Sequence, residues 1–159
     1  MFQPIAPSGT LTEQYELLRS QMTGLIESQV PQVTNLANFV ALLGFSLPEI
    51  NWVGVYLMDG DTLYLGPFQG LPACTTIPLG QGVCGTAAAT QLTMNIKDVH
   101  QFDGHIACDS ASNSELVIPL IKDGTLLGVL DIDSPVFDRF QAEDQHHLEI
   151  ITQEMLEKL

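Results

Sequence analysis

Basic residues are scarce in this chain. Lys and Arg together number 5 in 159 residues, against 19 Asp and Glu, so the formal net charge is -14. A field of that sign repels phosphate backbones and anionic lipid headgroups. The composition therefore argues against a nucleic-acid partner and against a membrane surface, and it favours a small ligand that carries a cationic group.

Long apolar runs are missing as well. No stretch of about 18 apolar residues occurs, and the start MFQPIAPSGT has neither the basic nor the apolar region of a signal peptide. We therefore expect no membrane span and a cytoplasmic protein. Cysteine is rare, with only Cys74, Cys84 and Cys108. An odd count in a reducing compartment argues against a static disulfide framework and leaves free thiols, metal ligands or redox groups.

The composition that remains is that of an ordinary globular protein, with 45% hydrophobic and 15% charged residues. The length is typical of one domain, so we expect a tail over residues 1–9 and a single catalytic domain over residues 10–159. Four helices are predicted from apolar residues at helical spacing and from cap and stop residues. The first begins at Thr10 or Thr12 and ends near Glu27, and the second covers 32–43 before a stop at Gly44. The third includes the alanine run 87–89, and the fourth covers 141–159.

Strands alternate with turn sequences between these helices. The runs WVGVYLM and TLYLGPF are joined by Asp59-Gly60-Asp61, and the runs ELVIPLI and TLLGVLDID by Lys122-Asp123-Gly124, which is typical of hairpins. A further strand and a long loop fill residues 91–114, and loops of that length in a compact domain are usually functional. The order of elements predicts an α+β fold with a central antiparallel sheet and helices packed mainly on one side.

The three cysteines lie in or beside segments rich in glycine, alanine or serine. One such cysteine is most often inert, but three together suit a redox catalyst, in which an oxidised thiolate is trapped by a second thiol as a reducible disulfide. Cys108 lies in HIACDS, where His105 would lower its pKa and Asp109 would raise it. The local signatures of a Cys-His hydrolase are absent, and the spacing is wrong for structural zinc, so we expect no metal.

Three acidic residues gather in the last two predicted strands. Glu115 opens one strand, and Asp131 and Asp133 close the next. Alternation places both aspartates on one face, and the hairpin brings Glu115 to the same end of the sheet. The group is either a solvated strand end or the lining of a pocket, where it would bind an ammonium group and raise the pKa of its own members. Trp52, the only tryptophan, is either a core residue or the wall of a pocket for a methyl group or a cation.

Longer segments carry a more specific signal. NWVGVYL, LGPFQG, ACTTIPLGQGVCGTA, DVHQFDGHIACDSASNSELVIPL and GVLDIDSPVFDRF closely resemble the free methionine-(R)-sulfoxide reductase family and cover most of the chain from Asn51 to Phe140. The resemblance implies a GAF-like fold and an oxidoreductase that reduces free L-methionine (R)-sulfoxide to L-methionine, with a role in oxidative stress. It also implies a homodimer without a bound cofactor.

The same resemblance implies roles for the cysteines. Cys108 is the nucleophile that attacks the sulfoxide sulfur, releases methionine and becomes a sulfenic acid. Cys74 or Cys84 then resolves it, with Cys74 and Cys108 as the stable pair, and thioredoxin or a similar dithiol restores the thiols. Many relatives carry arginine at two positions where this chain has Thr76 and Gln81, so the resolving thiols are expected to be less acidic here.

The acidic residues also receive roles from the resemblance. Glu115, Asp131 and Asp133 surround the ammonium group and the sulfoxide oxygen, with Glu115 or Asp133 as the general acid, and Trp52 lies against the S-methyl group. Backbone amides over residues 110–114 are candidates for the substrate carboxylate. The alternative hypothesis is a non-catalytic GAF domain that senses a small ligand or an oxidant.

Overall fold

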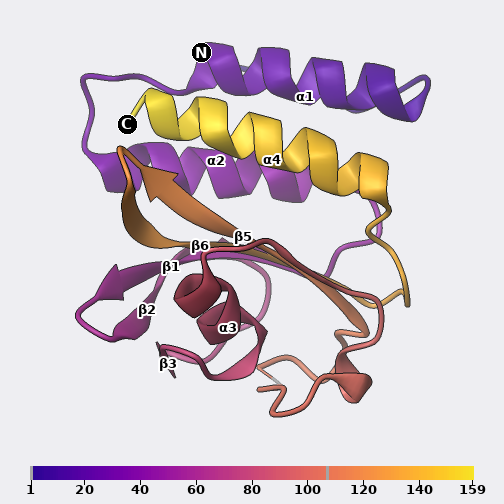
Figure 1. Cartoon of the computed structure of the whole chain (residues 1–159). Coiled ribbons are helices and arrows are strands. Elements are labelled where there is room, and N and C mark those ends of the chain that lie inside the picture. The colour runs from indigo at the N-terminus through magenta and orange to yellow at the C-terminus, as the bar shows by residue number, and fades with distance from the viewer. Residues whose placement is uncertain (1, 107) are drawn as a thin grey trace.

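A single antiparallel sheet of six strands, in the order β3-β2-β1-β6-β5-β4, forms the centre of the molecule (Figure 1). The structure is a computed structural model that describes residues 2–106 and 108–159. Met1 of the predicted tail and Ala107 of the segment HIACDS lie outside that description. The strands are β1 (Trp52–Asp59), β2 (Thr62–Gln69), β3 (Thr76–Pro78), β4 (Met94–Ile96), β5 (Ser114–Lys122) and β6 (Thr125–Ser134).

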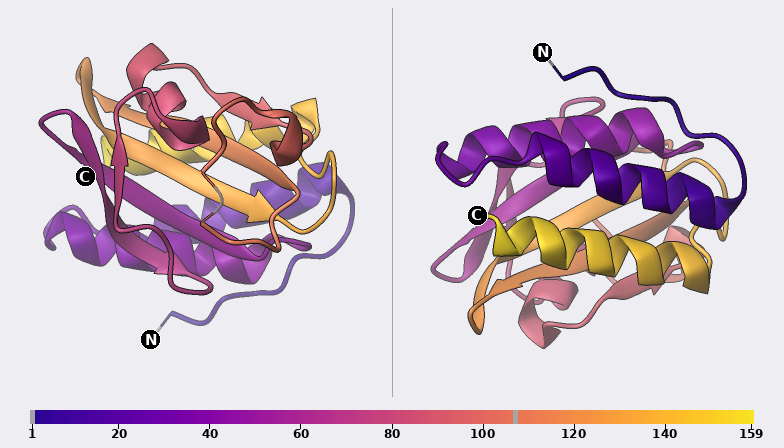
Figure 2. Two further views of the ribbon diagram at one scale, coloured as in Figure 1. Left: turned by 90° about the horizontal axis from the view of Figure 1, so that it is seen from below. Right: turned by 90° about the horizontal axis from the view of Figure 1, so that it is seen from above.

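Three long helices lie on one side of this sheet and one short helix on the other. Helices α2 (Gln32–Ser46) and α4 (Ala142–Glu157) pack on the sheet, and α1 (Leu11–Leu25) packs against both of them (Figure 1). Helix α3 (Gly82–Thr90) lies on the opposite face, with the loops that surround it (Figure 2). The predicted α+β fold, with helices mainly on one side of an antiparallel sheet, is confirmed.

The ends of the first two helices refine the sequence-based boundaries. Thr10, not Thr12, caps α1, and it forms a capping box with Glu13. The prediction that α2 stops before Gly44 is wrong, because the helix continues to Ser46. A Cβ at Gly44 would lie at an ordinary contact distance of 3.5 Å from side chains of β1 and β2, so Gly44 faces the sheet. The N–H of Leu47 closes the last turn on the carbonyl of Leu43.

The two faces of the sheet bury different sets of side chains, because neighbouring residues of a strand point to opposite faces. Val53 and Val55 of β1 face the long helices and join a large apolar core with residues such as Phe39. Trp52 and Tyr56 of the same strand face α3 and join a second, smaller cluster. The face towards α3 also carries the residues that the sequence singled out.

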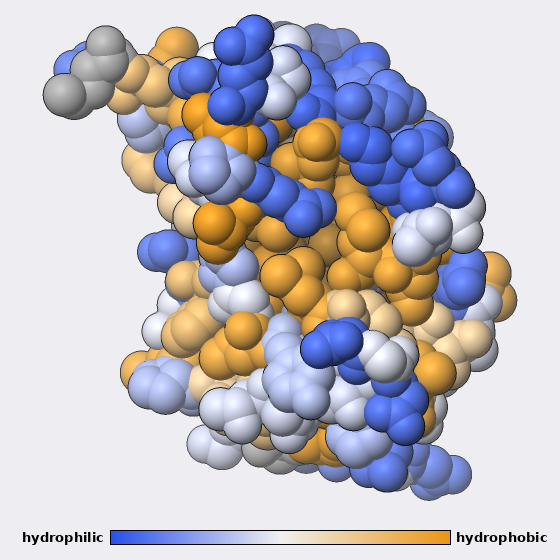
Figure 3. All heavy atoms as spheres, turned by 90° about the vertical axis from the view of Figure 1, so that its left-hand side faces the viewer, coloured by the Kyte–Doolittle hydropathy of each residue, from blue (hydrophilic) through white to orange (hydrophobic). Residues whose placement is uncertain are grey.

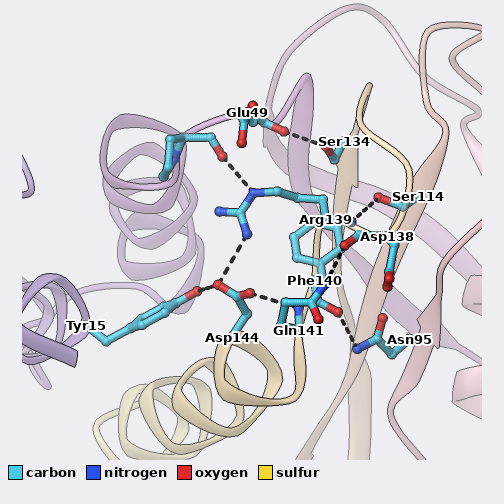
Figure 4. Close-up of polar contacts among 11 residues, drawn as sticks. Tyr15, Glu49, Asn95, Ser114, Ser134, Asp138, Arg139, Phe140, Gln141 and Asp144 are labelled. Carbon is cyan, nitrogen blue, oxygen red and sulfur yellow. Dashed lines mark hydrogen bonds and ion pairs between the residues drawn. The ribbon is translucent and has the colours of Figure 1, made fainter. Parts of the chain in front are cut away.

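A polar network ties the long helices to the ends of β5 and β6 (Figure 4). The carboxylate of Asp144 accepts hydrogen bonds from the Tyr15 hydroxyl at 2.6 Å, from Arg139 Nη1 at 3.2 Å and from the N–H of Gln141 at 2.8 Å. The hydroxyl of Ser114 accepts from the N–H of Arg139. The network fixes α1, the start of α4 and the first residue of β5 in one arrangement. That first residue, Ser114, directly precedes Glu115.

None of the helices in the described part of the chain combines the length and the apolar character needed to cross a bilayer.

Candidate active site

The register of three strands brings the acidic residues and the tryptophan together. Glu115 of β5 lies opposite Asp133 of β6, and Asp131 lies two residues along the same strand. On the other side of β6, Trp52 of β1 lies opposite Asp133. Directly paired residues and residues two apart share a face of the sheet, so all four side chains point towards α3.

These three carboxyl groups line a cavity and are buried. Their exposed fractions are 5% for Glu115, 7% for Asp131 and 9% for Asp133. Cys84 and Cys108 also line this cavity. The sequence left open whether the acidic residues form a solvated strand end or line a pocket, and their burial settles that choice in favour of the pocket.

Burial raises the pKa of each of these carboxyl groups well above its usual range. The neighbouring charge of Asp133 adds to the rise at Glu115, that of Glu115 to the rise at Asp131, and that of Asp131 to the rise at Asp133. One oxygen of Asp131, Oδ1, is buried without a hydrogen-bond partner among the described residues. A group of this kind favours either protonation or a cationic ligand.

No described Lys or Arg side chain lines the cavity, and its basic residue is His105. His105 Nε2 lies 3.6 Å from Glu115 Oε2. Burial lowers the pKa of His105, which favours the neutral imidazole at pH 7. The sequence suggested His105 as a partner that lowers the Cys108 pKa, whereas the imidazole in the structure lies beside the Glu115 carboxyl group.

Cys74 and Cys108 are joined by a disulfide, with their Cα atoms 5.4 Å apart. Both residues are half-buried, so the bond lies near the surface of the molecule. This is the pair that the family resemblance implies. Cys74 lies between β2 and β3, and Cys108 lies in the long loop before β5.

Cys84 is a free thiol on α3 and is buried. Its Sγ lies 3.9 Å from Glu115 Oε1. Burial, followed by the charges of Asp131 and Glu115, raises the pKa of Cys84 well above its usual range. A thiol of that kind holds little thiolate at neutral pH and is a poor nucleophile.

Ligand atoms of Cys84, Glu115 and Asp131 all lie within 4.8 Å of one another, which is compatible with a metal ion. Cys84 is the only cysteine in this set, and Cys74 and Cys108 are bonded to each other. Buried carboxyl groups without a cation suit an ammonium group equally well. The donor set is therefore compatible with a cation, and it does not distinguish a metal ion from an ammonium group.

Two aromatic side chains of β1 contact the segment that carries Cys74. Trp52 Nε1 donates a hydrogen bond to the carbonyl of Leu71 at 3.1 Å, and the Tyr56 hydroxyl donates to the carbonyl of Cys74 at 3.1 Å. Trp52 also lines a small cavity with Cys108, Asp109, Asp131 and Asp133. Its indole is therefore both a core residue and a wall of the site, two roles that the sequence offered as alternatives.

The loop after Cys108 uses its backbone amides internally. The N–H of Ala111 donates to the Asp109 side chain, that of Ser112 to the Asp109 carbonyl, and that of Asn113 to the Ser134 carbonyl. The expectation that amides over residues 110–114 are available to a substrate carboxylate is therefore wrong for these three. The side chain of Asn51 adds to this arrangement, since it donates to both Asp109 and Ser112.

Comparison with known proteins identifies the family. The GAF domain model matches residues 32–155. The free methionine-R-sulfoxide reductase of Escherichia coli (strain K12) is 53% identical over 137 residues, which cover 86% of this chain and 83% of that protein. The chain belongs to the free methionine-R-sulfoxide reductase family of GAF-domain proteins.

Solved structures of the family have the same fold. The fRMsr of Staphylococcus aureus in its reduced form aligns with a TM-score of 0.88 and 51% identity, over 91% of this chain and 94% of that one. The free methionine-R-sulfoxide reductase from Neisseria meningitidis in complex with its substrate aligns with a TM-score of 0.90 and 38% identity, over 99% and 97% of the two chains. The family fold therefore extends over nearly the whole chain, and the predicted family is confirmed.

The structure brings Cys84, Cys108, Glu115, Asp131 and Asp133 together around one cavity, with Cys74 bonded to Cys108 and Trp52 beside them. Two side-chain contacts were missed by sequence analysis: that of Tyr56 with the Cys74 carbonyl, and that of Asn51 with the loop after Cys108. The alternation of β1 places Tyr56 on the face of Trp52, so its orientation was open to prediction. Its contact with Cys74 was not, because 18 residues and a hairpin separate the two.

Proposed function

We propose that this protein reduces free L-methionine (R)-sulfoxide to L-methionine, with Cys108 as the nucleophile. The observation that carries the proposal is the group of three buried carboxyls beside the Cys74–Cys108 pair, in a cavity that no described Lys or Arg lines. The family membership supports the same reaction, because relatives over most of the chain carry that name.

The carboxyl groups supply the binding site for the substrate ammonium group. The unpartnered Oδ1 of Asp131 gains a hydrogen bond when a charged amine enters, and the ammonium offsets the repulsion between Asp131 and Asp133. Trp52 presents an apolar wall to the S-methyl group. A methionine sulfoxide inside a peptide has an amide nitrogen without charge, so this site selects the free amino acid.

Oxygen transfer requires a proton as well as a thiolate. In the first step the Cys108 thiolate attacks the sulfoxide sulfur and a carboxylic acid protonates the oxygen. The S–O bond of the sulfoxide breaks, the oxygen passes to the Cys108 sulfur as the hydroxyl of a sulfenic acid, and methionine leaves. A raised pKa favours the protonated form of a carboxyl group, and burial raises the pKa of both Glu115 and Asp133. Glu115 is the better candidate, because His105 beside it provides a route by which a proton returns from solvent.

The second step regenerates a reducible state. The thiol of Cys74 attacks the sulfenic sulfur, water leaves, and the Cys74–Cys108 disulfide forms. Cys74 is the main resolving thiol, and the high pKa and burial of Cys84 support a secondary role for that residue. The half-buried disulfide is then reduced by thioredoxin or a similar dithiol, which takes up the oxidation by thiol exchange.

We assign catalysis to one domain over residues 10–159 of a cytoplasmic homodimer that acts under oxidative stress. An open groove between α4 and β5 supports the dimer, and apolar residues such as Leu92, Ile121 and Ile150 line it. Hydrophobic side chains also gather in the middle of the face shown in Figure 3. Light scattering measures the oligomeric state of the wild type and of Leu92→Lys. We expect a dimeric wild type and a weaker dimer in the variant, and a monomeric wild type would contradict the proposed dimer.

The decisive test separates the two epimers of the substrate. Methionine release is measured from free R and S sulfoxides with dithiothreitol, for the wild type and for Cys108→Ser. We expect turnover of the R epimer alone and its loss in the variant. If intact, reduced protein turns over neither epimer, the enzyme proposal fails and a GAF domain that senses a ligand or an oxidant takes its place.

A further inference from the structure

The segment that carries Cys74 is held to the sheet by one backbone hydrogen bond, from the N–H of Leu65 in β2 to the Thr75 carbonyl at 3.0 Å, and otherwise by side chains. Residues 70–75 lie between β2 and β3 and belong to neither strand. Two of their carbonyl groups, those of Leu71 and Cys74, accept hydrogen bonds from Trp52 and Tyr56 of β1. The position of the Cys74 backbone therefore depends on two aromatic residues of another strand.

Those two residues are themselves fixed. Trp52 is 2% exposed and Tyr56 is 1% exposed, and their rings stack with centroids 5.9 Å apart, while Phe68 stacks on Trp52 at 5.5 Å. Gly54 lies between them on the same face, and a Cβ there would lie 2.4 Å from the indole. A rigid aromatic stack on β1 thus presents two hydrogen-bond donors to the Cys74 segment.

We propose that Tyr56 is a positioning residue for disulfide formation, because it holds Cys74 where its thiol reaches the sulfenic acid of Cys108. The inference rests on the proposed function and deepens it. In this step a bond forms between the two sulfur atoms, the S–O bond of the sulfenic acid breaks, and the oxygen leaves as water with the thiol proton of Cys74. Tyr56 acts on this step through the backbone of Cys74.

The physical basis is proximity. A thiol that is held near a reacting sulfur behaves as a very concentrated reagent, and an error of about 1 Å in its placement costs up to about a hundredfold in rate. The Cys74 carbonyl has the Tyr56 hydroxyl as its hydrogen-bond donor. Loss of that bond lets the segment sample positions in which Cys74 lies farther from Cys108, while Cys108 keeps its own surroundings.

The test compares the two chemical steps in Tyr56→Phe, which keeps the aromatic ring and removes the hydroxyl. Fully reduced protein is mixed with one equivalent of free methionine (R)-sulfoxide, and methionine release and disulfide formation are followed separately by rapid quench. We expect methionine release within about twofold of wild type, disulfide formation slower by about tenfold, and a matching increase in the sulfenic acid trapped by dimedone.

Two variants serve as controls. Tyr15→Phe removes a buried hydroxyl that donates to Asp144 among the long helices, and Tyr64→Phe alters an exposed tyrosine on β2. Both should keep the wild-type rate of disulfide formation, although Tyr15→Phe loses stability. A similar slowing in Tyr15→Phe would mean that general destabilisation explains the effect, and it would overturn the proposal.

Two results for Tyr56→Phe itself would also overturn it. One is an unchanged rate of disulfide formation, and the other is an equal loss in methionine release, which would make Tyr56 a substrate-binding residue. The same comparison with hydrogen peroxide as the oxidant of Cys108 needs no methionine sulfoxide. A failure of the proposed reduction is thereby distinguished from a failure of the positioning role.

Discussion

A buried carboxylate lies on each side of the central sheet, and the two have opposite surroundings. Among the long helices, Asp144 accepts hydrogen bonds from Tyr15 and Gln141 and pairs with Arg139 at 3.2 Å (Figure 4). On the face towards α3, one oxygen of Asp131 has no hydrogen-bond partner in the described chain, and a second carboxyl group, that of Glu115, lies beside Asp131.

The difference separates a structural face from a reactive one. A buried carboxylate whose partners are complete fixes the packing of helices and is neutral or favourable for stability. A buried carboxylate without partners costs stability, and it persists where a ligand supplies the missing charge. Substitutions on the two faces are therefore expected to have opposite consequences for stability and for activity.

The largest effect on stability is expected on the structural face, from Phe39→Ala. Phe39 is fully buried beneath the long helices. Loss of its ring should lower the free energy of unfolding by about 3–5 kcal/mol, because it leaves a cavity. Urea unfolding gives the stability, and activity is measured per folded molecule at low temperature. We expect kcat per folded molecule to stay near the wild-type value. A clear fall in this kcat would mean that the two faces are not independent.

On the reactive face, Glu115→Gln should act on the reaction and not on the fold. An amide cannot donate a proton as a carboxylic acid does, so kcat/KM should fall by about a hundredfold. The wild-type rate should also decline as pH rises through the elevated pKa of Glu115, and this decline should be absent in the variant. If Asp133→Asn produces these changes instead, Asp133 is the acid. Glu157→Gln at the exposed end of α4 is the matched control.

Asp131→Asn should stabilise the protein while it weakens substrate binding. The folded pKa of Asp131 is raised by burial, and the unfolded value lies near 3.9. As pH rises above about 4, the unfolded chain releases this proton first, so the wild type loses stability until the pH passes the folded pKa. Asparagine does not titrate in this range, so the variant does not lose stability in this way as the pH rises.

The stability gain of Asp131→Asn should therefore be near zero at pH 4 and about 1–2 kcal/mol at pH 8. The measurement is urea unfolding across this range with the disulfide intact. Asp59→Asn, on an exposed residue, provides the control. Parallel curves for the variant and the wild type would show that burial of Asp131 carries no cost.

The smallest effect concerns the charge of the reductant. Acidic side chains such as Asp109, Asp131 and Asp133 lie near the disulfide, and no described Lys or Arg lines the two cavities beside it. At equal thiolate concentration, cysteamine should reduce the disulfide several-fold faster than 3-mercaptopropionate at low salt. The ratio should shrink in about 0.5 M salt and in Gln81→Arg. Equal rates for the two thiols would contradict a field effect at the disulfide.

Much of the arrangement of the reactive face could be predicted from the sequence, because it depends on local patterns. Period-two alternation and the turn after Lys122 predicted that Glu115, Asp131 and Asp133 share a face. Both hairpins followed from short-range chemistry in the same way, and so did the start of α1, although the sequence left Thr10 and Thr12 open as its cap. The cysteine roles and the reaction came from the family resemblance and not from spacing.

Long-range contacts were not accessible. His105 lies three residues before Cys108 in the loop, yet its imidazole lies beside Glu115 of β5. The hydrogen bond from Tyr56 to the Cys74 carbonyl and the use of the loop amides depend on how distant segments meet. The continuation of α2 through Gly44 depends on packing against β2, which overrides the local preference of glycine for a helix end.

The most direct measurement compares free methionine (R)-sulfoxide with its N-acetyl derivative, which lacks the ammonium charge. If the buried carboxyls towards α3 bind that group, kcat/KM for the N-acetyl compound should be lower by at least about a hundredfold, because a desolvated carboxylate is left without its partner. Asp131→Asn should narrow this difference. Equal turnover of the two compounds by the wild type would contradict the role given to Glu115, Asp131 and Asp133.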